Sequence, residues 1–135
     1  PTQQVCRPSQ SSWGYKGFHE YWLNETNAWI YPHLHKAAER MIEISNREPA
    51  DELEWKALNQ AARELLLAQS SDWAFIMRTG TMVPYAVRRT RSHLMRFNKL
   101  YEDINIGKID SGWLEKVELM DNIFPNINYR VYRPL

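Results

Sequence analysis

The chain is poor in several features that mark membrane, secreted or nucleic-acid-binding proteins. Only one of its 135 residues is cysteine, Cys6, which excludes an internal disulfide and fits a reducing, cytoplasmic location. No apolar run approaches the roughly 18 residues that span a membrane, and no basic-then-apolar leader is present. The net charge is +1, so no global field attracts a polyanion. We therefore expect a neutral ligand or a protein partner, with no nucleic acid and no membrane.

Motifs that carry catalysis are also scarce. No nucleophile motif, phosphate loop or dinucleotide fingerprint is present. His33 and His35 lie two positions apart, so on a helix they point to different sides and make a poor metal pair. No other histidine, cysteine or carboxylate cluster has ligand spacing. The sequence predicts no metal, no cofactor and no catalytic residues in this chain.

Aromatic residues are abundant, with six Trp and seven Tyr. Trp13 and Trp22 lie in a glycine-containing segment, and Asp72 precedes Trp73 near the end of an apolar helical run. A tryptophan ring stacks on the apolar face of a pyranose, and a carboxylate accepts hydroxyl hydrogen bonds. Together these residues favour a site for a neutral sugar. The alternative is that the rings fill the core and that Asp72 is a solvated acid.

Hydrophobic spacing predicts about four helices joined by short loops. The first has its apolar face at Ile30, Leu34, Ala37, Met41 and Ile44. Asn24 or Asn27 is a candidate cap for this helix, and Pro32 should kink it or mark its first turn. The second should begin at a capping box of Asp51 and Glu54 and continue to Gly80.

The third predicted helix is the most regular and runs from about Pro84 to Gly107. The fourth follows Asp110 or Ser111 and ends at Pro125, with an apolar face of Trp113, Val117, Met120 and Phe124. Residues 127–132 alternate like an extended strand that lies against the helices or another domain. The predicted fold is all-α, a bundle of about four helices with an irregular N-terminal segment and an extended C-terminal tail. Residues 1–12 form a linker or packed loop, and 13–135 form the domain.

A basic stretch lies in the third helix, with no acid between Val83 and Tyr101. Its members are Arg88, Arg89, Arg91, His93, Arg96 and Lys99. These side chains either form a phosphate-binding face, pair with acids of the second helix, or dock another domain.

Five segments of the chain resemble one known domain. They are SSWGYKGFHEYWLN, HLHKAAERM, LLLAQSSDWAFIMRTG, YAVRRTRSHLMRFNKLY and DNIFPNINYRVY. Together they resemble the C-terminal helical domain of α-glucan branching enzymes of glycoside hydrolase family 57, and the last is most similar to cyanobacterial members. The resemblance covers nearly the whole chain, from about Cys6 to Tyr132.

The resemblance implies a larger parent enzyme whose N-terminal catalytic barrel carries the two catalytic carboxylates. Such an enzyme cleaves an α-1,4 glucan bond with retention and passes the chain to a 6-hydroxyl, and this domain completes the substrate groove beside the barrel. The chain alone is then inactive, and its partners are α-glucan and the barrel of the same parent. The substrate-binding residues implied by the matching motifs are Trp13, Trp22, Asp72, Trp73, Ser71 and His19. The rival hypothesis is a non-catalytic binding module for glucan, or for nucleic acid or protein through the basic helix 88–99.

Overall fold

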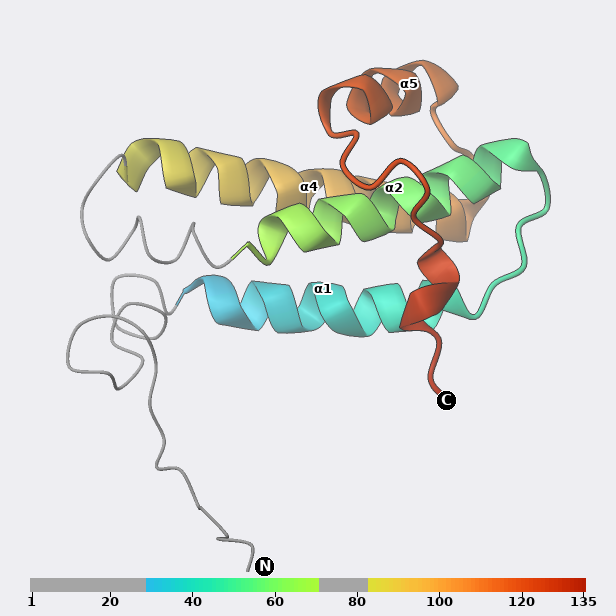
Figure 1. The fold of residues 1–135 in the computed structure, drawn as a ribbon, viewed down its shortest axis with the longest axis horizontal. Coiled ribbons are helices and arrows are strands. Elements are labelled where there is room, and N and C mark those ends of the chain that lie inside the picture. Colours follow the sequence, from blue (N-terminus) through green and yellow to red (C-terminus); the bar gives the residue numbers. More distant parts are fainter. Residues whose placement is uncertain (1–28, 71–82) are drawn as a thin grey trace, which may run out of the picture.

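The fold is described from a computed structural model, which describes residues 29–70 and 83–135. Four α-helices and one 3-10 turn make up this part of the chain: α1 (Ile30–Ser45), α2 (Glu52–Ala68), α4 (Val83–Ile106), α5 (Ser111–Met120) and η2 (Tyr129–Tyr132). The three longest helices lie side by side, and α5 lies near the end of the bundle that is opposite the start of α1 (Figure 1). The predicted all-α bundle is confirmed. None of the helices in the described ranges is both long and apolar enough to cross a membrane.

Helix α1 buries the face that its spacing predicts. Ile30, Ala37, Met41 and Ile44 are all buried, and Leu34 packs against them from a half-buried position. Pro32 lies in the first turn, where its missing N–H has no intrahelical partner to lose. Trp29 occupies the N-cap position without a side-chain hydrogen bond, so the proposal of Asn24 or Asn27 as the cap was wrong.

Helix α2 begins at the predicted capping box and ends earlier than predicted. The carboxylate of Asp51 accepts the backbone N–H of Glu54 at 2.8 Å, and the Glu54 carboxylate accepts the N–H of Ala50 at 3.2 Å. The predicted continuation through Ser70 to Gly80 was wrong, because the helix ends at Ala68. The N–H of Ser70 bonds to the carbonyl of Leu67 at 3.3 Å, which closes a tighter last turn. Gly80 lies outside the described residues.

The other two helices begin as predicted, and one of them ends early. Helix α4 ends at Ile106 and is followed by Gly107, whose φ of 80° is the left-handed conformation that glycine adopts without strain. Asp110 caps α5 by accepting the N–H of Trp113 at 3.0 Å. Helix α5 stops at Met120, so the predicted extension to Pro125 was wrong. Phe124 has a φ of 47° and is 60% exposed, and is therefore not on the buried face.

The prediction of an extended strand in the tail was wrong. Residues 129–132 form the 3-10 turn η2 instead, and Asn128 caps this turn through the N–H of Arg130 at 3.0 Å. Tyr129 is completely buried, and its hydroxyl donates to the Arg47 carbonyl at 2.6 Å. The alternation failed because a strand needs a neighbouring strand, and the described ranges contain none.

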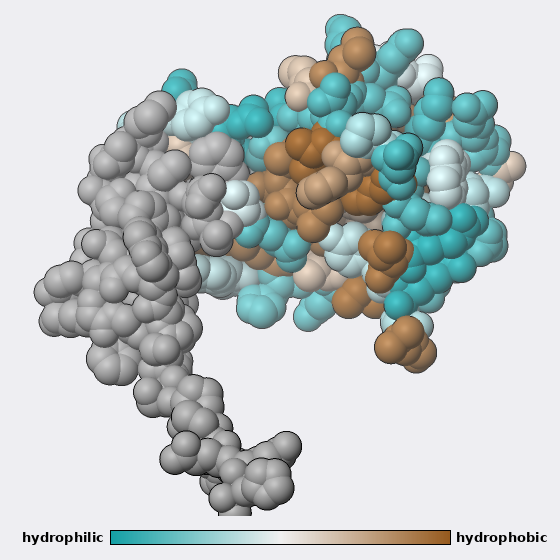
Figure 2. All heavy atoms as spheres, in the orientation of Figure 1, coloured by the Kyte–Doolittle hydropathy of each residue, from teal (hydrophilic) through white to brown (hydrophobic). Residues whose placement is uncertain are grey.

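The core lies where α2 packs against α4, with α1 covering both. Its centre holds Leu58, Leu65, Phe97, Leu100 and Ile104, all fully buried. Figure 2 shows apolar atoms gathered over α2 in the middle of the face that is viewed, with hydrophilic atoms around them. Helix α2 is therefore the central element of the bundle.

Candidate functional site

The six residues predicted to bind sugar lie outside the described residues. They are Trp13, His19, Trp22, Ser71, Asp72 and Trp73. Residues 1–12, the predicted linker or packed loop, lie outside as well. The described ranges begin and end next to these residues in the sequence. Trp29 follows Trp22 by seven positions in the sequence, and Ser70 immediately precedes Ser71.

The start of α1, the end of α2 and the start of α4 lie at the same end of the bundle (Figure 1). Ile30 of α1 packs with Ala86 of α4 in a small apolar cluster of their own. Tyr31 of α1 and Gln69 at the end of α2 line a common pocket of about 240 Å³. In the sequence, the predicted sugar-binding residues precede α1 or follow α2, and both of these helix termini lie at this end of the bundle.

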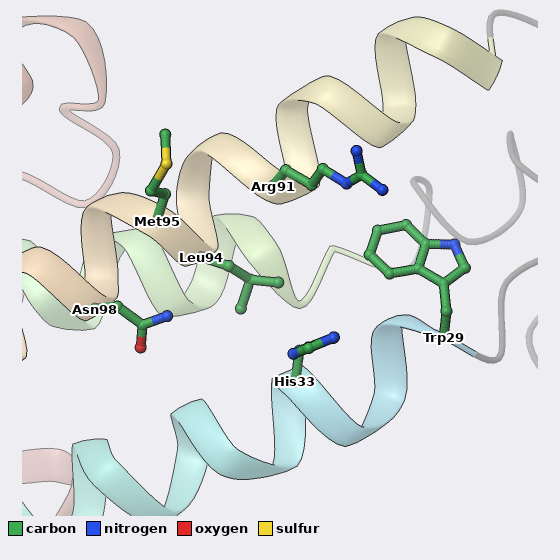
Figure 3. Close-up of a pocket in the computed structure, with 6 residues that line it drawn as sticks. All are labelled: Trp29, His33, Arg91, Leu94, Met95 and Asn98. Atoms are coloured by element: carbon green, nitrogen blue, oxygen red, sulfur yellow. The ribbon is translucent and has the colours of Figure 1, made fainter.

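A second pocket, of about 310 Å³, lies between α1 and α4 near the same end (Figure 3). We call it the Trp29 pocket, and its lining residues are Trp29, His33, Arg91, Leu94, Met95 and Asn98. The Arg91 guanidinium lies over the Trp29 ring, with its central carbon 5.4 Å from the ring centroid. The His33 ring meets the Trp29 ring edge-on, with centroids 6.4 Å apart. The indole is therefore held by two neighbours.

The two histidines of α1 line different pockets. His33 lines the Trp29 pocket on the α4 side, whereas His35 lines the pocket shared with Gln69 on the α2 side. Both side chains are exposed. The prediction that they point to different sides is confirmed.

A buried polar cluster joins three parts of the fold, and we call it the Glu64 cluster. It consists of Glu64 on α2, His93 on α4 and Asp121, which follows α5. The Nδ1 atom of His93 lies 2.7 Å from Oε2 of Glu64 and 3.6 Å from Oδ2 of Asp121. The side chains of Glu64 and His93 are completely buried, and that of Asp121 is 2% exposed. The cluster therefore fixes α4 and the end of α5 against α2.

Burial sets the charge of this cluster. Desolvation, with a hydrogen bond and the negative charge of Asp121, raises the pKa of Glu64 to about 9. Desolvation also lowers the pKa of His93 to about 4, and the charges of Arg89 and Arg96 act in the same direction against that of Asp121. Glu64 and His93 are therefore both neutral at pH 7. Oδ2 of Asp121 accepts from Nη1 of Arg96 at 2.8 Å.

Hydrogen bonds hold both oxygens of the Glu64 carboxyl group. Gln60 donates through Nε2 to Oε1 of Glu64 at 3.1 Å, and Oε2 of Glu64 faces Nδ1 of His93. Arg63 orients the Gln60 amide, because its Nη1 donates to the Gln60 Oε1 at 3.0 Å. Glu64 is therefore linked to α2 through Gln60 and Arg63, and to α4 through His93.

The Glu64 cluster has the residue types of a metal site, since its three ligand atoms lie within 4.8 Å of one another. Its surroundings favour a proton over a cation. A divalent ion would need to displace the proton of Glu64 and would stand beside Arg96, which already neutralises Asp121. We assign the cluster to structure.

The sequence analysis missed the Glu64 cluster and did not single out Trp29. The cluster carried one signal in the sequence. Gln60 and Glu64 lie four positions apart among the apolar residues of α2, where a solvated acid is out of place. The basic stretch meets an acid of the second helix at His93, which hydrogen-bonds to Glu64, whereas Arg96 pairs with Asp121, beyond α5. Trp29 carried no signal, because a single aromatic before a helix has many uses.

Comparison with known proteins identifies the family. Residues 33–132 match the family model described as 1,4-alpha-glucan branching enzyme, C-terminal. The match and the all-α fold together define the class as a helical C-terminal domain. The chain belongs to the family of C-terminal domains of 1,4-alpha-glucan branching enzymes.

Three relatives place the chain within longer proteins. It is 38% identical over 120 residues to the 1,4-alpha-glucan branching enzyme TK1436 of Thermococcus kodakarensis, covering 85% of this chain and 18% of that protein. The crystal structure of a GH57-type branching enzyme from Pyrococcus horikoshii matches with a TM-score of 0.87 and 34% identity, covering 99% of this chain and 26% of that one. The α-amylase AmyC from Thermotoga maritima matches with a TM-score of 0.74 and 50% identity, covering 83% of this chain and 22% of that one. The chain therefore spans only a small part of the relatives that it matches.

Proposed function

We propose that the chain binds α-glucan beside a catalytic barrel, in a cytoplasmic enzyme that makes α-1,6 branches by retaining transglycosylation. The chain completes the substrate groove, with Trp13, Trp22 and Trp73 as stacking platforms. Asp72 accepts a hydroxyl hydrogen bond or orients the Trp73 ring, and Ser71 and His19 are further polar contacts to the sugar. The barrel supplies the nucleophile and the acid/base.

The observation that carries this proposal is the convergence of three helix ends. The segments that contain Trp22 and Asp72–Trp73 join the described fold at the start of α1 and the end of α2, which lie together (Figure 1). Segments that are distant in the sequence are thereby attached to one end of the bundle. The family match supports the identity of the ligand as a glucan.

The buried carboxylates Glu64 and Asp121, within the described ranges, are not available to a glucan. Retaining transfer needs two carboxylates about 5 Å apart that reach the substrate. Glu64 and Asp121 lie close together, but both are buried and bonded to His93 and Arg96. A sugar cannot approach them without opening the core.

The test is a tryptophan substitution in a full-length enzyme that carries this chain beside its catalytic domain. Trp73→Ala should lower branch formation on long glucans by at least ~10-fold, because a buried aromatic contact to a ligand contributes about 2 kcal/mol or more. Branches are counted by debranching the product and measuring the released chains. The midpoint of thermal unfolding should stay nearly unchanged.

Trp113→Ala is the matched control. Trp113 is half-buried on α5, where Lys99 Nζ lies 4.9 Å from its ring centroid, away from the end where α1 begins. This variant should keep normal branching. If Trp73→Ala instead leaves branching intact and lowers the unfolding midpoint by several degrees, Trp73 is a core residue and its assignment to the sugar site is wrong.

A second candidate activity is hydrolysis of the α-1,4 bond, favoured by the 50% identity to the α-amylase of Thermotoga maritima. Both activities require the same glucan groove and differ in whether water or a sugar hydroxyl receives the cleaved chain. Counting reducing ends before the product is debranched separates them, because hydrolysis releases new reducing ends whereas branching conserves their number.

A further inference from the structure

We propose that the Trp29 pocket is an additional α-glucan subsite, formed by residues that were not predicted to bind sugar. Trp29 provides the apolar platform, and Asn98 and His33 hydrogen-bond to sugar hydroxyls. The inference rests on the proposed function, because it takes α-glucan as the ligand of the domain.

The size of the pocket fits a short piece of glucan. Its volume of about 310 Å³ lies at the lower end of the ~300–1,000 Å³ of typical ligand sites. It is formed by side chains of two helices that the core holds in place, so it exists before a ligand arrives. One or two glucose units suit such a site better than a large cofactor.

The indole in the apolar wall of the pocket has two neighbours. Arg91 lies over the Trp29 ring and His33 packs on it edge-on, and both contacts reduce the freedom that the half-buried indole has to lose when a ligand binds. Leu94 and Met95 extend the apolar surface along α4. A pyranose presents C–H groups on its ring faces, and these pack against such a wall.

The polar wall is also oriented. Nη1 of Arg40 donates to the Asn98 carbonyl oxygen at 2.8 Å, which turns the amide nitrogen the other way, towards the space between the helices (Figure 3). Arg40 is itself placed over the Tyr101 ring, 5.0 Å from the centroid. The two N–H groups of Asn98 therefore suit acceptor oxygens, and the His33 ring can donate or accept.

The lining favours a neutral ligand over an anion. Arg91 is the single lysine or arginine among the six lining residues, and it is engaged by Trp29. Anion sites usually converge several charge-assisted donors on one point. None of these six residues, all within the described ranges, is an acid, so they offer a cation no charged partner. A hydroxyl-rich ligand matches a wall of aromatic, amide and imidazole groups.

The experiment is an NMR titration of the 135-residue chain with maltoheptaose. The indole N–H signal of Trp29 is assigned by its loss in Trp29→Phe. We expect this signal to shift and saturate by about 10 mM sugar, a concentration that covers a millimolar Kd. The shift should not depend on salt, because the ligand is neutral.

The matched control uses the two histidines of α1, which are both exposed and line different pockets. His33→Ala should raise the Kd measured from the Trp29 signal about 3- to 10-fold, which is the range expected for the loss of one hydrogen bond. His35→Ala should leave the Kd unchanged. Equal weakening by both variants would overturn the assignment of His33 to the subsite.

Two further outcomes would also overturn the proposal. One is a Trp29 signal that does not saturate with maltoheptaose. The other is a shift with inorganic phosphate alone that disappears at high salt, which would reassign the pocket to anions. Either result leaves the proposed function standing if Trp73→Ala still lowers branch formation in the full-length enzyme by at least ~10-fold. The opposite result is also possible: the Trp29 signal shifts and saturates with maltoheptaose, but the full-length enzyme makes no branches. That result would refute the proposed activity and support the subsite.

Discussion

The Glu64 cluster and the Trp29 pocket use similar residue types in opposite surroundings. Each combines a histidine, arginine side chains and an amide or carboxyl group. In the Glu64 cluster the histidine is completely buried and its Nδ1 is bonded to Glu64, whereas in the Trp29 pocket the histidine is exposed. The comparison teaches that polar groups hold this bundle together where water is excluded and are available to a ligand where it is not. Substitutions in the two regions should therefore affect different properties.

The largest effect is expected when the Glu64 cluster loses its central carboxyl group. Glu64→Ala should lower the free energy of unfolding by about 3 kcal/mol, because it leaves His93 Nδ1 and the Gln60 amide without their buried partner. Urea denaturation measures the loss.

Glu64→Gln is the matched variant. It is neutral like the protonated acid, and its amide can donate to His93 and accept from Gln60. The expected loss is about 1 kcal/mol or less. Losses of equal size in the two variants would mean that Glu64 is ionised in the folded protein.

The next effect is a dependence of stability on pH. The pKa of Glu64 is raised to about 9 in the fold, so its contribution is complete below pH 4.5 and is lost as the pH rises through 9. The pKa of His93 is lowered to about 4, so its contribution is present above pH 6.5 and is lost as the pH falls through 4. The two slopes oppose each other between pH 4.5 and 6.5, and above pH 6.5 Glu64 acts alone.

We therefore expect the free energy of unfolding to fall between pH 6.5 and about 9, with a slope of at most ~1.4 kcal/mol per pH unit. Urea denaturation across this range measures the slope. Glu64→Gln should flatten it, because the titrating proton is gone. A slope that survives in this variant would trace the dependence to another group.

The smallest effect on stability is expected in the Trp29 pocket. His33→Ala should change the free energy of unfolding by no more than ~0.5 kcal/mol, since the side chain is exposed and touches Trp29 only at an edge. The same limit applies to His35→Ala. A loss of more than ~1 kcal/mol in His33→Ala would show that the pocket is part of the core and would remove the contrast between the two regions.

The sequence predicted the helices well because apolar spacing, caps and glycine act locally. Ile30 to Ile44, the Asp51 box and Gly107 all behave as their local patterns require. Local patterns failed where distant residues decide the outcome. Tyr129 turns inward because Arg47 and Asn59 accept its hydroxyl and its N–H, and both are at least 70 positions away.

The candidate sites show the same limit. In the Glu64 cluster, Glu64 on α2 and His93 on α4 are 29 positions apart, and Asp121 lies further along the chain. No motif of fixed spacing could therefore reveal the cluster. The Trp29 pocket needs the packing of α1 on α4 before Trp29 and Asn98 face the same space. The six sugar-binding residues named from the sequence remain predictions.

Arg63 has a consequence for how this domain can diverge. Its guanidinium donates to the backbone carbonyls of Ile123 at 2.9 Å and Pro125 at 3.2 Å, and not to any side chain of that segment. Every amino acid carries the same carbonyl, so residues 122–126 can drift in identity while the segment stays attached to α2. At position 124 substitution is even favoured, because the φ of 47° suits glycine or asparagine better than phenylalanine. Related domains should therefore differ freely in these side chains while keeping an arginine at position 63.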